Sequence, residues 1–374
     1  MNSRRELLKR SAALVSAMSL GGVAGEAKTT RERSYRRIAA EEAFAPSEWI
    51  VLMRNMLKQG KLDEANKASW GIFLDPSIAF IPDGLTDLPQ GRLRYMDEND
   101  IAMQVVSLTA PGVQIFNVDD ARNLAMIYND YLADIVKSHP DRFAGLAAVA
   151  PQDPGSAAKE IDRAVSKLGL RGVIINSHTH GEYLDDRKFW PIFEAAVAKE
   201  VPIYLHPTYP TATMWPSYKD YGLGGAIWGF AAETGLHSMR LILGRVFDEF
   251  PTLKIVLGHM GESIPFWFWR LDYMYKAMKG AASPTWPMPK RSPSEYFLDN
   301  FIITTSGMNW HPVLKFCHEV LGPERIMFAI DYPYQRDTPD AIQFMDTAPI
   351  PEEDKQKIYH GNAEKIFGLS KISA

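Results

Sequence analysis

The sequence has few features that would place it in a nucleotide-dependent or nucleic-acid-binding class. Its 374 residues include one cysteine, so no disulfide can form within the chain. No glycine-rich phosphate loop or dinucleotide motif follows an apolar run, which argues against a bound nucleotide. Lys and Arg form no cluster beyond residue 40 and the net charge is −4, and both facts argue against nucleic-acid binding.

The single cysteine, Cys317, is also poorly placed for a nucleophile. It lies in the helix-like segment KFCHEV, and no predicted strand ends at it. We therefore interpret it as a buried, unreactive thiol and not as a catalytic group.

The sequence has no clear membrane span either. Its N-terminal apolar segment, 11–24, is short and is interrupted by Gly21 and Gly22. Arg4 and Arg5 precede this segment in a pattern close to a twin-arginine signal. We expect residues 1–27 to be a twin-arginine-type export signal and 28–36 a linker, which predicts a periplasmic location. The alternative is a basic tail on a cytoplasmic protein.

A hydrophobic content of 46% is sufficient for a large core in one domain, residues 37–374. Apolar runs bounded by Gly, Pro, Asp or Asn are typical of buried parallel strands. Eight such runs occur: Arg37–Ala43, Ala102–Ala110, Phe143–Ala150, Gly172–Ser177, Pro202–His206, Leu253–His259, Phe301–Ser306 and Arg325–Asp331.

Helix-like segments separate these runs: Asp119–His139, Ser156–Leu168, Asp186–Lys199, Trp228–Phe250 and Pro312–Leu321. The alternation predicts an α/β fold, a single (β/α)8 TIM barrel with inserted loops at its C-terminal face. We expect the aromatic segments 70–80, 209–228 and 266–286 to be loops that either close over a bound ring or contact another subunit.

Four of the predicted strands end in polar residues, which a buried parallel strand does not need. Glu41 and Glu42 lie near the end of the first strand, and His206, His259 and Asp331 end three later ones. The C-terminal ends of barrel strands meet on one face, so these residues should form one site.

Glu41, His206 and Asp331 make a ligand set that suits a divalent cation such as Mn²⁺ or Zn²⁺ with open positions. Side chains alternate along a strand, so only one of Glu41 and Glu42 can face the barrel axis, and we assign Glu41. Each residue also has an ordinary explanation, since strand-end histidines are often core residues and Asp is often a helix N-cap.

His259 and Glu262 lie three residues apart in GHMGE, a spacing that puts both on one side of a helical turn. We expect Glu262 to fix the tautomer of His259, which would contact Asp331 or the substrate and move protons there. The alternative is that Glu262 only begins a helix.

Two further groups are candidates for substrate contact. Arg270 lies in the aromatic run FWFWRLDYM, where burial requires an anionic partner, either Asp272 or a substrate carboxylate. His178 in NSHTH just follows the fourth strand and is a candidate substrate contact, whereas His180 lies beyond the end of the strand.

The motifs at these positions resemble those of the amidohydrolase-related decarboxylases, a group that includes γ-resorcylate, 2,3-dihydroxybenzoate and 5-carboxyvanillate decarboxylases. The resemblance covers nearly all of residues 37–369 and includes RIAAEEAFA, INSHTHGEYLDD, IYLHP, GHMGE, WRLDYM, AIDYPYQ and GNAEKIFGL. The first of these is most similar to 5-carboxyvanillate decarboxylases, while His180 stands where that branch has a glutamine-like residue.

The resemblance implies a barrel of the metal-dependent hydrolase type. It implies one divalent metal ion, preferably Mn²⁺, on Glu41, His206 and Asp331, and no organic cofactor. It also implies proton transfer by Asp331 with His259 and Glu262, binding of the substrate carboxylate by Arg270, a pocket contact from Tyr334, and a homodimer or homotetramer.

The reaction so implied is the non-oxidative decarboxylation of a 2-hydroxybenzoate-type aromatic acid, with protonation of the ring carbon. The alternative on the same residues is a metal-dependent hydrolase or hydratase of a lactone, amide or conjugated acid. A non-catalytic binding protein is a third class, which loss of a metal ligand would indicate.

Overall fold

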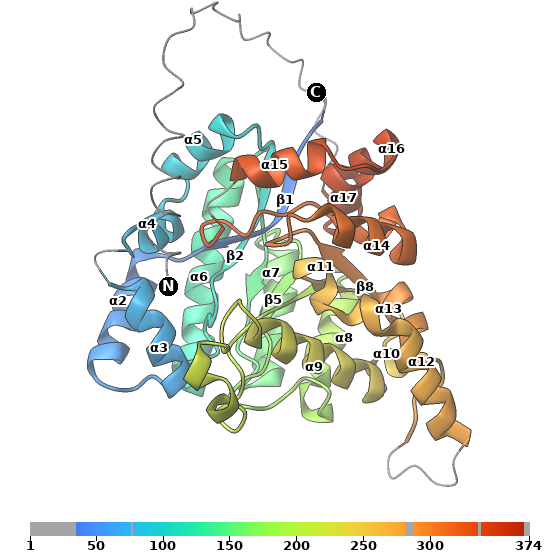
Figure 1. The fold of residues 1–374 in the computed structure, drawn as a ribbon. Coiled ribbons are helices and arrows are strands. Elements are labelled where there is room, and N and C mark those ends of the chain that lie inside the picture. Colours follow the sequence, from blue (N-terminus) through green and yellow to red (C-terminus); the bar gives the residue numbers. More distant parts are fainter. Residues whose placement is uncertain (1–34, 76–77, 281–286, 336–337, 370–374) are drawn as a thin grey trace, which may run out of the picture. The chain divides into compact units, whose positions relative to one another are not determined.

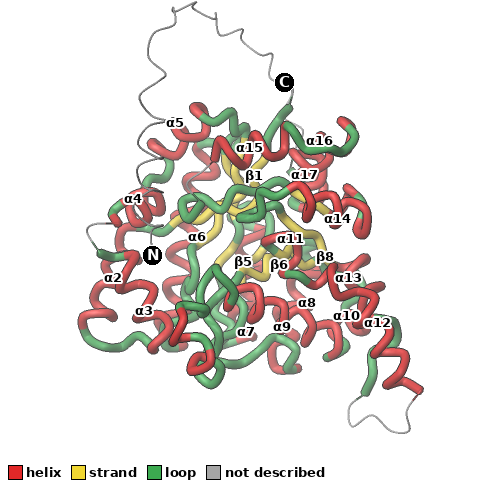
Figure 2. Tube along the Cα trace, viewed as in Figure 1, coloured by secondary structure: helices red, strands yellow, loops and turns green. Residues whose placement is uncertain are grey.

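Strands that follow one another in the chain are also neighbours in space, and each pair runs parallel. The computed structural model describes residues 35–75, 78–280, 287–335 and 338–369. Within them the strands are β1 (Ile38–Phe44), β2 (Met103–Leu108), β3 (Phe143–Gly145), β4 (Ala147–Ala148), β5 (Val173–Asn176), β6 (Ile203–His206), β7 (Ile255–Leu257), β8 (Phe301–Thr304) and β9 (Ile326–Met327). They lie at the centre of the molecule with helices outside them (Figures 1 and 2).

The strands close into a (β/α)8 barrel, as the sequence predicts. β3 and β4 are one strand interrupted at Leu146, whose N–H donates to the carbonyl of Val106 at 3.0 Å. The first strand meets the last through single hydrogen bonds, from Ala40 N to Phe328 O at 2.9 Å and from Ala43 N to Tyr332 O at 2.8 Å. We call this junction between β1 and residues 328–332 the closing seam.

All eight predicted runs contain strands of the barrel, but the last is shorter than expected. Of Arg325–Asp331, only Ile326–Met327 forms a regular ladder. The ladder cannot continue to the end of the run because Asp331 has a φ of 73°, in the left-handed region. This change of conformation places the predicted ligand at a bend and not on a straight strand.

The helices cover the outside of the barrel (Figure 1). They are α2 (Ser47–Lys58), α3 (Glu64–Phe73), α4 (Phe80–Thr86), α5 (Gln90–Glu98), α6 (Val118–Ser138), α7 (Pro154–Ser166), α8 (Trp190–Ala198), α9 (Gly229–Leu243), α10 (Val246–Glu249), α11 (His259–Glu262), α12 (Ile264–Gly280), α13 (Pro293–Asn300), α14 (His311–Leu321), α15 (Thr338–Asp346), α16 (Glu352–Gln356) and α17 (Asn362–Ile366). Polar caps begin several of them: the side chain of Asn117 accepts from the N–H of Asp120, and that of Asp153 accepts from the N–H of Ser156.

One of the three expected aromatic loops is largely helical. Segment 70–80 includes only the end of α3 and the first residue of α4, whereas residues 266–280 belong to α12. Pro265 is at the start of α12, where proline is tolerated, and no breaker follows until Gly280. The expectation of a loop over the ring was therefore wrong for α12, which extends away from the barrel (Figure 1).

The loop after β5 is fixed to α9 by a buried chain of hydrogen bonds. The N–H of Leu184 donates to His237 Nε2 at 3.1 Å, so His237 carries its proton on Nδ1 and donates to Ser177 Oγ at 3.0 Å. Ser177 and Tyr183 then donate to the two oxygens of Glu233 at 2.9 and 2.8 Å. Burial lowers the pKa of His237 to about 3, so the ring stays neutral.

The predicted export signal at 1–27 lies outside the described residues, as does most of the linker at 28–36. Among the described helices, none combines the length and the apolar character needed to cross a membrane. Cys317 is buried in α14, as expected, and burial raises the pKa of its thiol to about 12.

Candidate active site

The structure brings the three predicted metal ligands together at one end of the barrel. Glu41 comes from β1, His206 from the end of β6, and Asp331 from the bend after β9. One ligand atom of each residue lies within 4.8 Å of the others. The three residues are at least 125 positions apart in the sequence, and they are adjacent in space because the C-terminal ends of the barrel strands share one face.

Glu41 presents one oxygen to this cluster and uses the other for hydrogen bonds. Thr304 Oγ1 donates to Glu41 Oε2 at 2.8 Å, and Ser306 Oγ also donates to Oε2. Oε1 is buried and has no hydrogen-bond partner among the described residues, and it lies 3.8 Å from His206 Nε2. A buried carboxylate oxygen without a donor is costly unless a cation is bound there.

His206 is held in the tautomer that a metal ligand needs. Its Nδ1 lies 2.9 Å from the carbonyl oxygen of Pro207, which can only accept, so Nδ1 carries the proton. The lone pair of Nε2 is then directed away from the backbone toward Glu41. Hydrogen bonding of the remote ring nitrogen to a carbonyl is typical of histidines that bind metals.

Asp331 belongs to this cluster and also contacts the second predicted pair. His259 Nε2 lies 3.9 Å from Asp331 Oδ2, and His259 Nδ1 lies 2.7 Å from Glu262 Oε1. Glu262 is buried, so it fixes the ring of His259 from the side opposite Asp331. This arrangement agrees with the expected chain from Glu262 through His259 to Asp331.

The turn that joins His259 to Glu262 has a different backbone from the one expected. Every residue from His259 to Ser263 has a positive φ, between 49° and 80°. A left-handed turn, not a right-handed helix, therefore places the two side chains together, and only Gly261 in it adopts this conformation freely. Such strain persists only where surrounding contacts hold the residues, as is common at functional sites.

Burial and close charges alter the acidity of these groups. Burial opposes charge on Glu41, but the charge of the nearby His259 lowers its pKa below the ordinary value. Burial raises the pKa of Asp331. Burial alone would lower the pKa of His259, but the charges of Glu262 and Glu41 hold it well above the ordinary range. The two shifts favour a charged His259 imidazole and a protonated Asp331 carboxyl group.

The donor set fits a divalent metal ion. It combines two carboxylate oxygens and one imidazole nitrogen, of which Glu41 Oε1 is unpartnered and His206 Nε2 is deprotonated. Ions such as Mn²⁺ and Zn²⁺ accept this combination of ligands. Gly258 leaves space for the Glu41 carboxylate, since a Cβ there would lie 3.0 Å from Oε1.

Glu42 is turned away from this cluster, in agreement with the assignment of Glu41 as the ligand. An irregularity in the pairing of β1 with β2 lies between Ala39 and Glu42. The Glu42 carboxylate accepts from the N–H groups of Ile330 and Tyr332, and Gln104 Nε2 lies 3.4 Å from it. Burial raises the pKa of Glu42 to about 8.

Of the three predicted substrate contacts, Tyr334 is placed best. Its hydroxyl lies 2.6 Å from Thr109 Oγ1, and its ring lies 5.6 Å from that of Phe73. His178 is half-buried, but backbone groups engage both of its ring nitrogens: the carbonyl of Tyr209 and the N–H of Gly181. The roles of both residues stay predictions.

Arg270 does not lie in the setting assumed for it. It is exposed on α12, so no desolvation requires an anionic partner. Asp272 is bonded to Ser294 instead, at 3.0 Å to its N–H and 2.5 Å to its hydroxyl. Among the described residues, Arg270 has no ion pair or hydrogen bond, and its role in substrate binding stays a prediction.

Sequence reasoning missed the groups that support Glu41. Thr304 ends strand β8 and Ser306 lies two residues beyond it, and the hydroxyl of Tyr204 on β6 lies 3.2 Å from Thr304 Oγ1. Hydroxyl residues at the end of an apolar strand were a usable signal, because such a strand has no need of hydrogen-bonding side chains.

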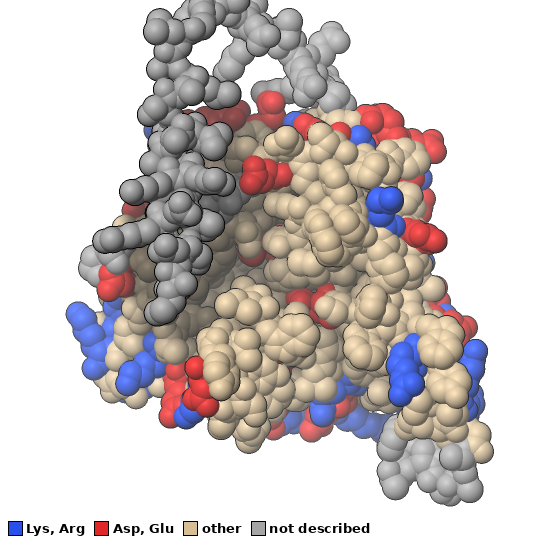
Figure 3. All heavy atoms as spheres, viewed as in Figure 1, with Lys and Arg blue, Asp and Glu red and all other residues tan. Residues whose placement is uncertain are grey.

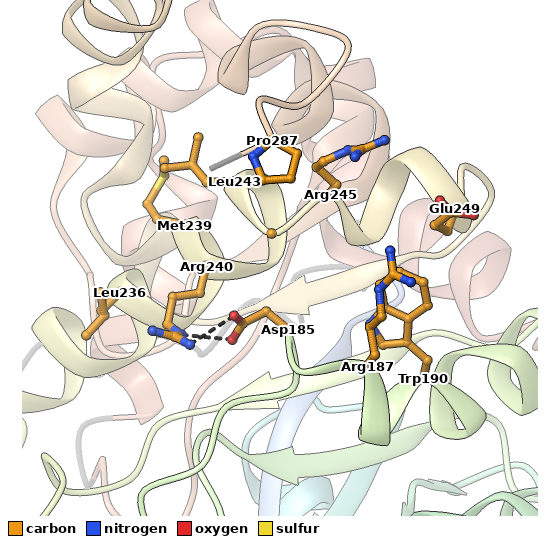
Figure 4. A pocket seen from close by; sticks show the side chains of 11 residues that line it. Asp185, Arg187, Trp190, Leu236, Met239, Arg240, Leu243, Arg245, Glu249 and Pro287 are labelled. Carbon is orange, nitrogen blue, oxygen red and sulfur yellow. Dashed lines mark hydrogen bonds and ion pairs between the residues drawn. The ribbon is translucent and has the colours of Figure 1, made fainter. Parts of the chain in front are cut away.

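A separate recess of about 580 Å³ lies beside α9 and the loop after β5. Asp185 and Arg240 pair across it at 2.8 and 2.9 Å, and Arg187 stacks on Trp190 (Figure 4). None of the predicted site residues lines it, so it is distinct from the metal-ligand cluster.

Comparisons with known proteins agree with this geometry. A model of the amidohydrolase family matches residues 75–369. The γ-resorcylate decarboxylase of Polaromonas sp. strain JS666 is 37% identical over 311 residues, which are 79% of this chain and 94% of that protein.

Solved structures give a similar result. The 5-carboxyvanillate decarboxylase of Sphingomonas paucimobilis has a TM-score of 0.83 and 45% identity, and the match covers 90% of this chain and 99% of that one. The enzyme of Novosphingobium aromaticivorans, crystallised with manganese and 3-methoxy-4-hydroxy-5-nitrobenzoic acid, has a TM-score of 0.88 and 42% identity over 92% of this chain and all of that one.

Replacement of Gly258 by alanine tests the space around Glu41. The added Cβ would lie 3.0 and 3.1 Å from the two carboxylate oxygens, so Glu41 must move. We expect Mn²⁺ affinity, measured by isothermal titration calorimetry, to fall by about tenfold or more. The control is Gly71→Ala in α3, where a Cβ meets nothing within 4 Å. Equal affinity in Gly258→Ala and Gly71→Ala would refute this view of the site.

Proposed function

Because the chain belongs to the amidohydrolase family, we propose that it is a metal-dependent, non-oxidative decarboxylase of a 2-hydroxybenzoate-type aromatic acid. The observation that carries this proposal is the position of Asp331. It is at once a member of the ligand cluster and 3.9 Å from His259, so one carboxyl group links the bound substrate to a proton source. The compounds in the Novosphingobium structure support a 5-carboxyvanillate-like substrate.

Glu41, His206 and Asp331 would hold the metal ion, for which Mn²⁺ is preferred and Zn²⁺ is the alternative. When bound, the ion supplies a Lewis acid and a template for the phenolate and carboxylate oxygens of the substrate. Tyr334 and Phe73 provide aromatic surface near Asp331 that suits a flat ring.

Asp331 delivers the proton in this proposal. Burial raises its pKa above the ordinary value, which favours the protonated carboxyl group. The proton is transferred to the ring carbon that bears the substrate carboxylate, and a new C–H bond forms. The C–C bond then breaks, CO₂ leaves, and its electron pair returns to the ring, so no organic cofactor is needed. His259, held by Glu262, returns a proton to Asp331.

The activity is tested by CO₂ release from a panel of 2-hydroxybenzoates, including 5-carboxyvanillate, with Mn²⁺-loaded protein. Asp331→Asn removes the proton donor, and we expect release to fall by about 10²-fold or more. Asp97→Asn, which removes an exposed partner of Arg142, is the control and should leave the rate unchanged. Stoichiometric Mn²⁺ without CO₂ from any acid would instead favour a hydrolase or hydratase.

We also propose that the chain forms a homodimer or homotetramer through α12 and its surroundings. Phe266, Trp267, Trp269 and Tyr273 on α12 are 53–76% exposed, and Trp310 beside α14 is 62% exposed. Figure 3 shows that uncharged side chains cover much of this side of the molecule. Covered aromatic side chains bury about 150–250 Å² each, so this face can supply much of the roughly 800 Å² per subunit in a standard interface.

Replacement of Trp269 by glutamate tests this interface. The variant should elute as a smaller species than the wild type in size-exclusion chromatography with light scattering, since a charge replaces an aromatic contact. Ile127→Glu, at a 57% exposed apolar residue on α6, is the matched control. A wild-type monomer, or an unchanged assembly in Trp269→Glu, would rule the interface out.

We further propose that residues 1–27 direct export to the periplasm by the twin-arginine route. The support is the Arg4-Arg5 pair followed by the apolar segment 11–24. In cell fractionation, the full chain should appear in the periplasm, and the double variant Arg4→Lys, Arg5→Lys should remain in the cytoplasm. Equal distributions of the two would favour a cytoplasmic protein.

A further inference from the structure

Asp331 is held in a conformation that its own side chain does not favour. Its φ of 73° lies in the left-handed region, which a residue with a Cβ enters only at a cost in free energy. Its N–H donates to Glu41 O at 3.1 Å, and its carbonyl accepts from Gln335 N at 2.9 Å. These two bonds engage the N–H and the carbonyl of Asp331 itself, whereas the N–H groups of its neighbours Ile330 and Tyr332 have no backbone acceptor among the described residues.

The carboxylate of Glu42 accepts hydrogen bonds from both of these N–H groups. Glu42 Oε1 accepts from the N–H of Ile330 at 3.0 Å, and Oε2 accepts from the N–H of Tyr332 at 3.2 Å. One side chain on β1 thus spans Asp331 and replaces the backbone acceptors that a continuing strand would have supplied. The contacts join residues 288 and 290 positions apart.

Glu42 is itself held in place. It is 1% exposed, and Gln104 Nε2 lies 3.4 Å from its Oε2. The fully buried Arg92 donates to Gln104 Oε1 at 3.1 Å and to the carbonyl of Ala43 at 2.8 Å. Both ends of the contact are therefore rigid, and neither N–H can turn to water if the carboxylate is removed.

We propose that Glu42 is a positioning residue that sets the conformation of Asp331 and thereby the affinity of the site for its metal ion. Both carboxylate oxygens of Glu42 are already engaged by peptide N–H groups, so it acts through Asp331 and not as a ligand. The inference rests on Asp331 being a metal ligand, which is part of the proposed function. A purely structural role would lower stability and leave the metal affinity of the folded protein unchanged.

The test is Glu42→Gln, which keeps the shape of the side chain. A glutamine offers one acceptor oxygen, so either Ile330 N–H or Tyr332 N–H would face an NH₂ group. We expect the Kd for Mn²⁺ of the folded variant, from calorimetry or electron paramagnetic resonance, to rise by about 10–100-fold. The matched control is Glu160→Gln, another buried glutamate with two donors, Asn129 and Arg163, on elements that carry no proposed ligand.

A second background shows whether the effect passes through Asp331. In Asp331→Ala, the two remaining ligands should bind Mn²⁺ weakly. Glu42→Gln added to this variant should change its Kd by less than about twofold, because Glu42 acts on the metal site only through Asp331 and the effects of coupled residues do not add. An equal loss in both backgrounds, or an unchanged Kd in Glu42→Gln, would overturn the proposal.

The remaining outcomes separate this inference from the proposed function. If Glu42→Gln does not fold, Glu42→Asp, which keeps the carboxyl group but is one methylene shorter, should show the same weakening, and wild-type affinity in it would overturn the proposal. Wild-type protein that binds Mn²⁺ but releases no CO₂ contradicts the decarboxylase and leaves the role of Glu42 intact. Wild-type protein without Mn²⁺ affinity contradicts the metal site itself.

Discussion

Two adjacent carboxyl groups in the middle of β1 are both buried, and the geometry of the whole site depends on which hydrogen-bond partners each of them has. Glu41 receives hydroxyl donors on one oxygen and keeps the other free, beside His206. Glu42 points the other way and receives two peptide N–H groups from the bend that carries Asp331. A single strand therefore contributes one proposed metal ligand and holds the backbone beside another.

The backbone of the site is strained in two places, and both present functional groups. Asp331 has a positive φ, and so do the five residues from His259 to Ser263. In each case buried side-chain contacts hold the unfavourable conformation, through Glu42 at the first place and through Glu262 at the second. The regular barrel thus supplies the rigidity that permits irregular backbone at its C-terminal face.

Sequence patterns were sufficient to find the strands and their polar ends, because a buried strand that ends in Glu, His or Asp is chemically unusual. They were not sufficient for Glu42, since alternation says only that it points away from Glu41, and its partners come from the far end of the chain. The burial expected around Arg270 is absent for a similar reason: an aromatic run indicates burial, but α12 exposes several of its rings.

The closing seam joins the first strand of the barrel to the last, so it closes the longest loop in the domain and has a large entropic cost in folding. Glu41 lies on one side of that seam and Asp331 on the other. A cation bound by both residues would link the first strand of the barrel to the last. Such a link can form only after β1 has paired with residues 328–332. Metal binding would then govern how slowly the barrel opens, and thus the lifetime of the folded protein, as well as its chemistry.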